Sequence, residues 1–508
     1  MQRREALLHV GAMTIVAPAP AVRAEGSGAA LTPQDFGAVG DGQADDTGAL
    51  QRMLDRARET GAEAHLSPGV YAISEYLRVR NGLRAILGRG GVIRCVESRQ
   101  NAGLLLAGVA LGERDNVRGL RIEGLVIDAA LRERPVNAIH GQNCLDCRIA
   151  GNRVVNLRAG SGVLIQSQQA GRQAAADNLI EDNVIEGVAG QSGTQWWGIV
   201  LSAQRSFVPP ARDQDEQWKA HFIAADAPLP ITGHVVRGNR ISGGYYGIWL
   251  MAARNCRVQD NHTADNVRNI SVSDCSLDNL VSGNQCQESL SSAIHLAYGS
   301  RRNRINGNRI ATARAQGEGL LQAYIGVEEN LFMDNEVDAT GRPQYLIYCA
   351  IHADRNEFRG NQLKGTASRA CIALESAWRW TLLNPAHYGF LKGPGNIRFA
   401  RAGSTDNRFV GNVIDNWGDA PAIFLAQVGG AETALTGTVL AGNRVAGNPR
   451  TRQLELLEET EGQLRGLSLS GNRFAAGAQA TQFVLPRGLD HCVEARGNGA
   501  LDRWLGTR

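Results

Sequence analysis

The stretch "DFGAVGDGQADDTGALQRMLDRA" (Asp35–Ala57) combines closely spaced glycines with the start of an amphipathic helix. Asp46 and Thr47 form a typical helix N-cap, and Gly61 supplies a C-terminal stop. Three apolar residues share one face of this helix: Leu50, Met53 and Leu54. The chain should enter the helix through turns at three glycines: Gly37, Gly40 and Gly42. We therefore expect a short helix whose apolar face covers a neighbouring element.

The same stretch carries an acidic cluster, Asp41, Asp45 and Asp46, which raises the alternative of a calcium site. The spacing of an EF-hand loop is absent, and no Glu closes the segment. Short acidic side chains are also common at turns and helix starts. The sequence favours a structural role for this cluster, and we expect no metal or other cofactor, with calcium as the minor alternative.

An Asn-centred motif recurs along most of the chain, as in "AGNRVV" (150–155), "RGNRIS" (237–242) and "SGNQCQ" (282–287). The central Asn stands at positions 152, 183, 239, 261, 284, 308, 335, 361, 412, 443 and 472. The steps between 239 and 361 are 22–27 residues long, whereas the steps 183–239 and 361–412 are about twice that. At those two places either one repeat carries an insertion or the motif is lost from a repeat.

Short runs with alternating apolar residues lie between the Asn motifs, for example "YGIWLM" (246–251), "SAIHLA" (292–297) and "ACIALE" (370–375). Alternation predicts strands with one buried face, and so short a repeat buries that face only by stacking on its neighbours. Asn at a fixed turn position tolerates left-handed backbone and can hydrogen-bond the Asn of the next repeat. Leucine-rich repeats need a Leu pattern with helices, and propeller blades are longer. The sequence therefore predicts an all-β parallel β-helix with an N-terminal capping helix.

The N-terminus has the features of an export signal. Arg3 and Arg4 precede a short apolar run (7–16), and Val22 and Ala24 fit the small-residue pattern before a cleavage site. Paired arginines before a weak apolar segment are typical of a twin-arginine signal, with an ordinary Sec signal as the alternative. The run is too short to span a bilayer. We expect a periplasmic or secreted protein with these parts: a signal at 1–24, a single β-helix domain at 25–498 and a tail at 499–508.

The composition of the chain limits the kinds of partner that we expect it to bind. The net charge is +3 with both signs interspersed, so neither nucleic acid nor membrane is expected as a partner. The nine cysteines are scattered and odd in number, which does not fit a disulfide framework and favours small core residues.

Together with "HLSPGVYAIS" (65–74), the opening stretch closely resembles the N-terminal signature of the pectate-lyase-like right-handed β-helix superfamily. That superfamily includes pectin-degrading enzymes, exo-acting glucanases and phage tailspikes. The signature covers about residues 35–75, and the Asn repeats extend the resemblance to residue 498. The resemblance implies a right-handed β-helix that acts on polysaccharide. With its paired arginines the chain also resembles exported bacterial β-helix repeat proteins.

In such a fold, equivalent outward residues of successive coils lie about 4.8 Å apart, so an extended polysaccharide can follow them. Aromatic outward residues concentrate in the middle repeats, and flat aromatic faces stack on sugar rings. The predicted substrate-binding residues are Trp197, Tyr246, Trp249, His352 and Glu375. Packing of the aromatics beneath a neighbouring insertion is the alternative.

A second outward set suits β-elimination on a uronic acid: Arg268, Asp274, His295, Tyr298, Tyr324 and Tyr348. The hydrogen on C5 is acidic only when the adjacent carboxylate is neutralised, which Arg268 can do. His295 is the best candidate for the base, and a Tyr hydroxyl can protonate the leaving oxygen. The alignment of repeats puts Leu321 level with His295 and Tyr324 level with Tyr298, although the repeats of Tyr324 and Tyr348 can slip by one residue. For His295, an ordinary exposed strand residue is the alternative.

Hydrolysis needs two carboxylates at a defined separation, and Asp274 with Glu318 or Glu375 are the candidates. The motifs of the pectin-hydrolase, calcium-dependent pectate lyase and uronan-epimerase branches are absent from the repeat region. We therefore expect a polysaccharide lyase-like enzyme more than a hydrolase. A non-catalytic carbohydrate-binding or envelope structural protein on the same scaffold is the alternative.

Two long insertions, 203–233 and 377–403, flank the middle repeats. Long loops on a regular scaffold are often functional. These two can wall a groove or make an oligomer contact.

Overall fold

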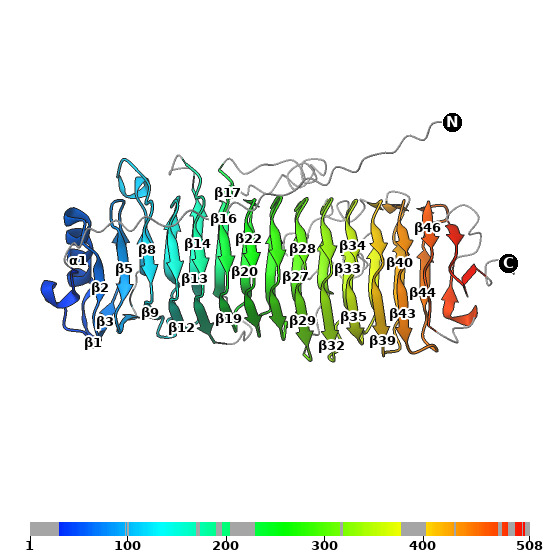
Figure 1. Ribbon diagram of the computed structural model, residues 1–508, viewed down its shortest axis with the longest axis horizontal. Coiled ribbons are helices and arrows are strands. Elements are labelled where there is room, and N and C mark those ends of the chain that lie inside the picture. The colour runs from blue at the N-terminus through cyan, green and yellow to red at the C-terminus, as the bar shows by residue number, and fades with distance from the viewer. Residues whose placement is uncertain are drawn as a thin grey trace, which may run out of the picture.

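The chain forms one elongated stack of coils in a computed structural model (Figure 1). The structure describes residues 30–96, 98, 101–168, 173–188, 196–203, 229–314, 319–376, 403–430, 433–475, 480–485, 493–499 and 501–502. The predicted export signal lies outside the described residues, as do most of the two predicted insertions and of the predicted tail. Within the described ranges, no helix is long and apolar enough to cross a membrane.

Three long sheets run along the stack. Each coil contributes one strand to sheet A, then one to sheet B and one to sheet C, before the chain returns to sheet A one coil further on. Neighbouring strands pair in parallel, as in the successive pairs of each sheet. The architecture is the predicted all-β, right-handed parallel β-helix.

The described strands of the three sheets have the following bounds. Sheet A contains β2 (Ala64–Leu66), β5 (Ala85–Gly88), β8 (Arg121–Glu123), β11 (Arg148–Ala150), β14 (Leu179–Glu181), β18 (Val235–Arg237), β22 (Arg257–Gln259), β25 (Leu280–Ser282), β28 (Arg304–Asn306), β31 (Leu331–Met333), β34 (Glu357–Arg359), β38 (Arg408–Val410), β42 (Val439–Ala441), β46 (Leu467–Ser470) and β48 (Val493–Arg496). Sheet B contains β1 (Asp41–Asp45), β3 (Gly69–Ile73), β6 (Gly91–Cys95), β9 (Val126–Asp128), β12 (Arg153–Leu157), β15 (Val184–Gly187), β19 (Arg240–Ser242), β23 (His262–Ala264), β26 (Gln285–Gln287), β29 (Arg309–Thr312), β32 (Glu336–Ala339), β35 (Gln362–Gly365), β39 (Val413–Asn416) and β43 (Arg444–Gly447). Sheet C contains β4 (Tyr76–Val79), β7 (Ala102–Leu106), β10 (Val136–Gln142), β13 (Gly160–Ser167), β16 (Trp196–Ala203), β20 (Tyr246–Met251), β24 (Arg268–Ser273), β27 (Ser292–Ala297), β30 (Gly319–Tyr324), β33 (Tyr345–Ala350), β36 (Ala370–Glu375), β40 (Ile423–Gln427), β44 (Leu454–Glu458) and β47 (Phe483–Val484).

Short elements complete the coils. Two small sheets consist of β17 (Ile231–Thr232) with β21 (Ala253–Arg254), and of β37 (Ser404–Thr405), β41 (Leu435–Thr436) and β45 (Leu464–Arg465). The described helical elements are η1 (Pro33–Phe36), α1 (Thr47–Thr60), η2 (Val109–Leu111) and η5 (Ala480–Gln482).

The core lies inside the coils. Strands of sheets A and B turn their central residue inward, so that like residues stack from coil to coil. Phe358 packs between Phe332 and Phe409, with ring centroids 4.6 and 5.0 Å away. The eight cysteines in the described part of the chain are buried free thiols, as the sequence favoured, and Cys492 lies outside it.

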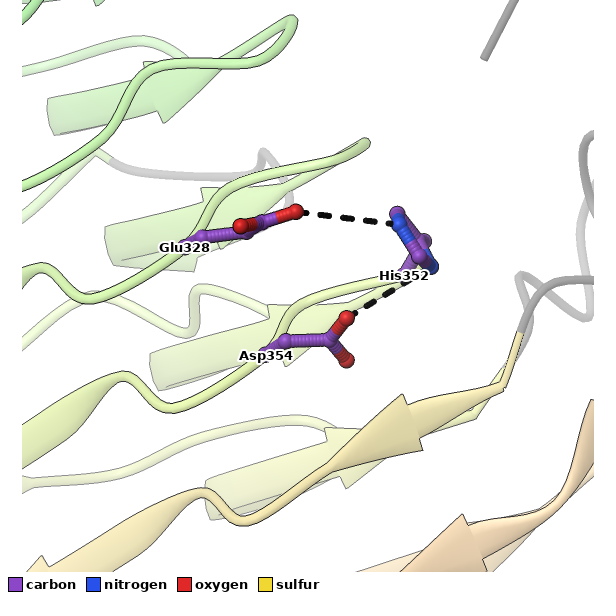
Figure 2. A group of neighbouring side chains, drawn as sticks. All are labelled: Glu328, His352 and Asp354. Atoms are coloured by element: carbon purple, nitrogen blue, oxygen red, sulfur yellow. Dashed lines mark ion pairs between the residues drawn. The ribbon is translucent and has the colours of Figure 1, made fainter. Parts of the chain in front are cut away.

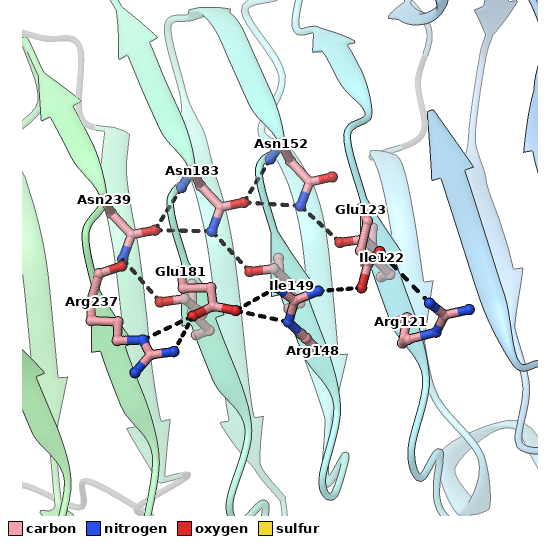
Figure 3. A network of polar contacts seen from close by, with 11 residues as sticks. Arg121, Ile122, Glu123, Arg148, Ile149, Asn152, Glu181, Asn183, Arg237 and Asn239 are labelled. Carbon is pink, nitrogen blue, oxygen red and sulfur yellow. Dashed lines mark hydrogen bonds and ion pairs between the residues drawn. The ribbon is translucent and has the colours of Figure 1, made fainter. Parts of the chain in front are cut away.

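A ladder of buried Asn side chains joins sheet A to sheet B (Figure 3). The Oδ1 atom of Asn183 accepts hydrogen bonds from the backbone N–H and the Nδ2 of Asn152, at 3.0 and 2.9 Å. The Nδ2 of Asn183 donates in turn to the carbonyl of Ile149 and to Asn239 Oδ1. The same pattern runs from coil to coil as far as Asn498. The predicted ladder is confirmed.

The ladder also settles the two long steps in the repeat. Asn183 bonds directly to Asn239, and Asn361 bonds directly to Asn412. Each long step is therefore a single coil that carries an insertion.

The left-handed backbone falls on the residue before each ladder Asn, not on the Asn as predicted. Gly151, Asp182 and Gly238 have φ values of 61°, 54° and 65°. The Asn side chain has to point inward to reach both neighbouring coils, so the preceding Gly or Asp makes the turn.

A second Asn ladder, which the sequence analysis missed, joins sheet C to sheet A. It runs through Asn279, Asn303, Asn330, Asn356 and Asn407, with side-chain contacts of 2.9–3.2 Å. Each of these stands five residues before an Asn of the first ladder, a spacing that could have revealed it. In one coil His234 takes the Asn position, and its Nδ1 accepts the backbone N–H of Asn178 at 3.1 Å.

The helix α1 covers the N-terminal end of the stack, where it contacts β4, β2 and β3 (Figure 1). Leu50, Met53 and Leu54 are buried, and Gly61 ends the helix with a φ of 70°. The three predicted turn glycines all have positive φ: Gly37, Gly40 and Gly42. The capping helix is confirmed, and it protects strand edges that would otherwise be open.

Asp46 was expected to cap the start of the helix, but it binds the preceding turn instead. Its carboxylate accepts the backbone N–H groups of Val39 and Gly40, at 2.7 and 3.0 Å, and makes no cap bond to the helix. The helix start is served by Asp45, whose Oδ1 accepts the N–H of Thr47 at 3.0 Å.

Asp41 and Asp45 are also engaged locally. The Oδ1 of Asp41 accepts the N–H groups of Gln43 and Ala44, and these bonds lower the pKa of Asp41. The Oδ2 of Asp45 accepts the hydroxyl of Ser74 at 2.7 Å. The acids of the opening stretch therefore hold turns together, which supports their structural role.

Candidate functional site

The outer face of sheet C differs from those of sheets A and B. Outward residues of sheets A and B are mostly exposed or half-buried. In the sheet C strands β27, β30, β33 and β36, by contrast, every residue is buried. Most predicted site residues lie on this face, so they are less accessible than an open polysaccharide groove requires.

The register of sheet C fixes which predicted residues are neighbours. His295 lies between Ser271 and Gln322, and Tyr348 follows Gln322. The alignment that placed Leu321 level with His295 was wrong by one residue, because Leu321 belongs to the inward-facing core row. Tyr348 does stand in the row of His295, but two coils away.

Three predicted aromatic residues, Trp197, Tyr246 and Trp249, lie together on the outer face, and we call them the aromatic platform. The rings of Tyr246 and Trp249 stack with centroids 4.4 Å apart, and Trp197 lies 6.1 Å from Trp249. The Nε1 of Trp249 donates to Ser273 Oγ at 2.9 Å. All three platform side chains are half-buried, so part of each ring stays open to a ligand. Their role in sugar binding stays a prediction.

Arg268 lies between the platform and His295. Its guanidinium carbon is 5.7 Å from the ring centroid of Tyr246, and its Nη1 lies 3.3 Å from the Tyr246 hydroxyl. Asp274 follows β24 in left-handed backbone and accepts the hydroxyl of Ser273 at 2.6 Å. Burial raises the pKa of Tyr246, and the nearby charge of Arg268 opposes that rise. A cation and a carboxylate thus stand beside the platform.

His295 is outward-facing but only 2% exposed, unlike the exposed strand residue considered above. Its Nδ1 lies 2.9 Å from Ser271 Oγ, and its Nε2 has no hydrogen-bond partner among the described residues. Burial, and then the charge of Arg268, hold the pKa of His295 well below its usual value. The imidazole is therefore neutral. When Nδ1 donates to Ser271, Nε2 carries the free electron pair of the ring and is the acceptor.

Tyr298 and Tyr324 complete this group, which we call the histidine cluster: Arg268, His295, Tyr298 and Tyr324. Tyr324 pairs with Ala297, one position earlier than predicted, and its ring lies 5.1 Å from His295. The rings of the two tyrosines are 6.1 Å apart. Burial raises the pKa of Tyr298, against a hydrogen bond with Tyr324, so Tyr298 stays protonated at neutral pH.

Tyr348 and Glu375 form a separate buried group with Tyr345. The Tyr345 and Tyr348 hydroxyls donate to the two oxygens of Glu375, at 3.1 and 3.0 Å. Their rings stack with centroids 4.5 Å apart. Burial, followed by the charge of Glu375, raises the pKa of Tyr345. The structure therefore places Tyr348 beside Glu375 and not beside the predicted base.

His352 lies apart from the platform, in a group with Glu328 and Asp354 (Figure 2). Its Nε2 is 4.0 Å from Glu328 Oε1, and its Nδ1 is 3.7 Å from Asp354 Oδ2. One donor atom from each residue lies within 4.8 Å of the others, an arrangement that can hold a metal ion. The sequence analysis missed both carboxylates, although each stands two residues before an Asn of the second ladder.

Chemically, the outer face of sheet C offers a stacking surface, a cation and a neutral imidazole on neighbouring coils, with Arg268 in the row of Tyr246 and His295 in the row of Trp249. A planar sugar face suits the platform, and an anionic substituent suits Arg268. The hydroxyl of Tyr298, whose raised pKa keeps it protonated, can donate a proton.

Two family models match parts of the chain. A model described as "Rhamnogalacturonase A/epimerase, pectate lyase-like" matches residues 33–209. A second, described as "Periplasmic copper-binding protein (NosD)", matches residues 229–397. Both are right-handed β-helix families, which confirms the resemblance found in the sequence. No curated protein matches the chain.

Solved structures share the fold at low identity. The pre-mature gene product 12 of bacteriophage phi29 is 10% identical to this chain, with a TM-score of 0.52. The match covers 92% of this chain and 55% of the phage protein. A mutant tailspike protein of E. coli bacteriophage HK620, in complex with a hexasaccharide, is 12% identical, with coverages of 85% and 78% and a TM-score of 0.51. The A-module of the Azotobacter vinelandii mannuronan C-5 epimerase AlgE6 is 14% identical, with coverages of 88% and 100% and a TM-score of 0.44. These likenesses bear on the fold alone.

Proposed function

Because this chain is a right-handed parallel β-helix that matches a pectate-lyase-like family model over residues 33–209, we propose that it binds a uronic-acid-containing polysaccharide and cleaves it by β-elimination. One observation carries the proposal: Arg268 lies between the aromatic platform and the neutral imidazole of His295. The family model for rhamnogalacturonase and pectate-lyase-like proteins, matched over residues 33–209, supports a polysaccharide as the substrate.

In the proposed reaction the platform stacks on one sugar ring and Arg268 pairs with the uronate carboxylate. The Nε2 of His295 takes the proton from C5. The electron pair forms the C4–C5 double bond as the bond from C4 to the glycosidic oxygen breaks. The hydroxyl of Tyr298 or Tyr324 protonates that oxygen.

The carboxylate of the substrate also improves the base. In the free protein burial, and then the charge of Arg268, disfavour the imidazolium form of His295 and lower its pKa. A uronate bound to Arg268 offsets that charge, so His295 becomes more basic when the substrate is in place. Because the pKa of free His295 lies well below the usual value of about 6.5, kcat/KM should persist below pH of about 6.5.

The test is the ultraviolet absorbance of unsaturated uronates during incubation with polygalacturonate, alginate and other acidic polysaccharides. We expect a signal that falls about 100-fold or more in His295→Gln, as for loss of a general base. Trp417→Ala is the matched control, because Trp417 is exposed and lies outside the aromatic platform. Reducing ends released without absorbance would instead identify a hydrolase.

Non-catalytic glycan binding is the second candidate, and the burial of His295 favours it. In that case Trp249→Ala would weaken binding of a polysaccharide in affinity electrophoresis, while neither absorbance nor reducing ends appear. Full binding in Trp249→Ala would contradict a role of the aromatic platform, and the absence of both binding and product with every polysaccharide would contradict both candidates.

We also propose a periplasmic or secreted location. The paired arginines at positions 3 and 4 and the family model described as periplasmic support it. Cell fractionation of the full chain should recover it outside the cytoplasm, and recovery only from the cytoplasm would overturn this location.

A further inference from the structure

We propose that Glu328, His352 and Asp354 bind a divalent transition-metal ion such as Zn²⁺. This group stands apart from the histidine cluster, so the inference does not depend on the proposed lyase activity. Figure 2 shows the two carboxylates side by side, from neighbouring coils, both directed at the imidazole. Glu328 and Asp354 are paired residues of those coils, and one donor atom from each of the three residues lies within 4.8 Å of the others.

Each carboxylate has one oxygen anchored and the other directed at His352. The Oε2 of Glu328 lies 3.0 Å from Arg355 Nη2, which leaves Oε1 toward the ring. The Oδ1 of Asp354 accepts the backbone N–H of Thr405 at 2.9 Å, which leaves Oδ2 toward the ring. Outer contacts of this kind fix the orientation of metal ligands before the ion binds.

The distances suit an ion better than a direct contact. The gaps of 4.0 and 3.7 Å between the ring nitrogens and the carboxylate oxygens exceed a hydrogen bond. Zinc lies about 2.0–2.2 Å from nitrogen and oxygen ligands, so two atoms that share one ion are about 3–4 Å apart. The two gaps involve different ring nitrogens, so one ion can use only one of them. One nitrogen of His352 and one oxygen of each carboxylate lie within 4.8 Å of one another and would be the three ligands.

The burial and the charge of the three side chains also favour a bound cation. The three side chains are only 10–13% exposed, so the two like-charged carboxylates are poorly screened by water. Arg355 pairs with Glu328, and a bound cation would compensate Asp354 as well. The ion would thus cross-link two successive coils.

The donor set selects the class of cation. Two carboxylate oxygens and one imidazole nitrogen suit Zn²⁺, whereas Cu⁺ prefers thiolate and thioether ligands. Three protein ligands leave at least one coordination position for water or an anionic group.

The test is isothermal titration of the chelator-treated full chain with ZnCl₂, together with the visible absorption spectrum of the Co²⁺-loaded protein. We expect one Zn²⁺ per chain, a Co²⁺ spectrum typical of nitrogen and oxygen ligands, and a loss of affinity of at least about tenfold in His352→Gln and Asp354→Asn. Glu329→Gln is the matched control, because exposed Glu329 also pairs with Arg355 but does not face His352.

No Zn²⁺ binding by the full chain would overturn the proposal, as would binding that is unchanged in both His352→Gln and Asp354→Asn. Each variant is first checked by circular dichroism without metal. If His352→Gln fails to fold, Glu328→Gln replaces it, because that change keeps the size of the side chain.

Discussion

At the scale of single residues, burial decides the protonation state of two histidines, His234 and His295. His295 and His234 are both buried and have lowered pKa values, His234 to about 4. In each, one ring nitrogen has a hydrogen-bond partner and Nε2 has none among the described residues. His295 faces the outer surface of sheet C, whereas His234 fills an Asn position of the second ladder. The lowered pKa keeps His295 neutral on the outer face of sheet C, where we propose that it acts as the base. It makes His234 a buried group whose protonation destabilises the fold in acid.

Replacement of His234 by Asn should make the protein more resistant to acid. Because the pKa of His234 falls from about 6.5 unfolded to about 4 folded, its destabilising effect is absent above about pH 6.5 and grows as pH falls toward 4. Full protonation costs about 3 kcal/mol at the rate of 1.36 kcal/mol for each unit. His234→Asn should remove this loss and give Asn178 an Asn neighbour, although Cys256 still interrupts the ladder in the next coil.

The measurement is the thermal midpoint of wild type and His234→Asn between pH 7.5 and 4. His262→Asn is the control, because His262 is a half-buried residue on the outer side of β23. Parallel acid profiles for wild type and His234→Asn would contradict the assignment.

At the scale of elements, the Asn ladders hold neighbouring coils in register. Each ladder Asn joins three coils, because it accepts from the Asn of one neighbouring coil and donates to that coil's backbone and to the next Asn. Ion pairs on the outer face of sheet A run beside the first ladder, as between Glu181 and its partners Arg148 and Arg237 (Figure 3). These pairs are partly exposed, so we assign most of the register to the buried amides.

Asn308→Ala should destabilise the stack by about 3 kcal/mol. The change removes the acceptor of the Asn284 N–H and Nδ2 and the donor to the carbonyl of Val281, and all of these groups are buried. The matched control is Asn306→Ala, on the outward side of β28, which should change stability by less than about 0.5 kcal/mol. Chemical denaturation followed by circular dichroism measures both, and equal losses in the two variants would contradict a special role for the ladder.

At the scale of the whole molecule, the β-helix is a stack that must close its ends. The helix α1 covers the first coils with Leu50, Met53 and Leu54, while the acids of the preceding turn tie the chain to it. The aromatic platform and the histidine cluster lie on strands of sheet C in the middle coils, away from this capped end.

Met53→Asp should release the cap and cause self-association. A buried, unpaired carboxylate costs about 3–5 kcal/mol, and detachment of α1 would expose the edges of the first coil. Size-exclusion chromatography with light scattering should show larger species at micromolar concentration. Arg56→Asp, a change on the exposed side of the same helix, should leave the mass unchanged. An unaltered mass for Met53→Asp would show that the cap is not what protects the stack.

The sequence by itself determined the parallel β-helix, its capping helix and the first Asn ladder, because each rests on local, repeated signals: strand alternation, a helix face and one Asn per coil. It also selected the aromatic platform and the outward position of His295. Only the tertiary structure decided the rest. The one-residue shift of Tyr324 follows from how Leu321 stacks in the core. The burial of His295, the engagement of Glu375 by two tyrosines and the meeting of Glu328, His352 and Asp354 all depend on contacts between residues of different coils. Strand alternation specifies which way a side chain points, but burial and partners are set by what packs against it.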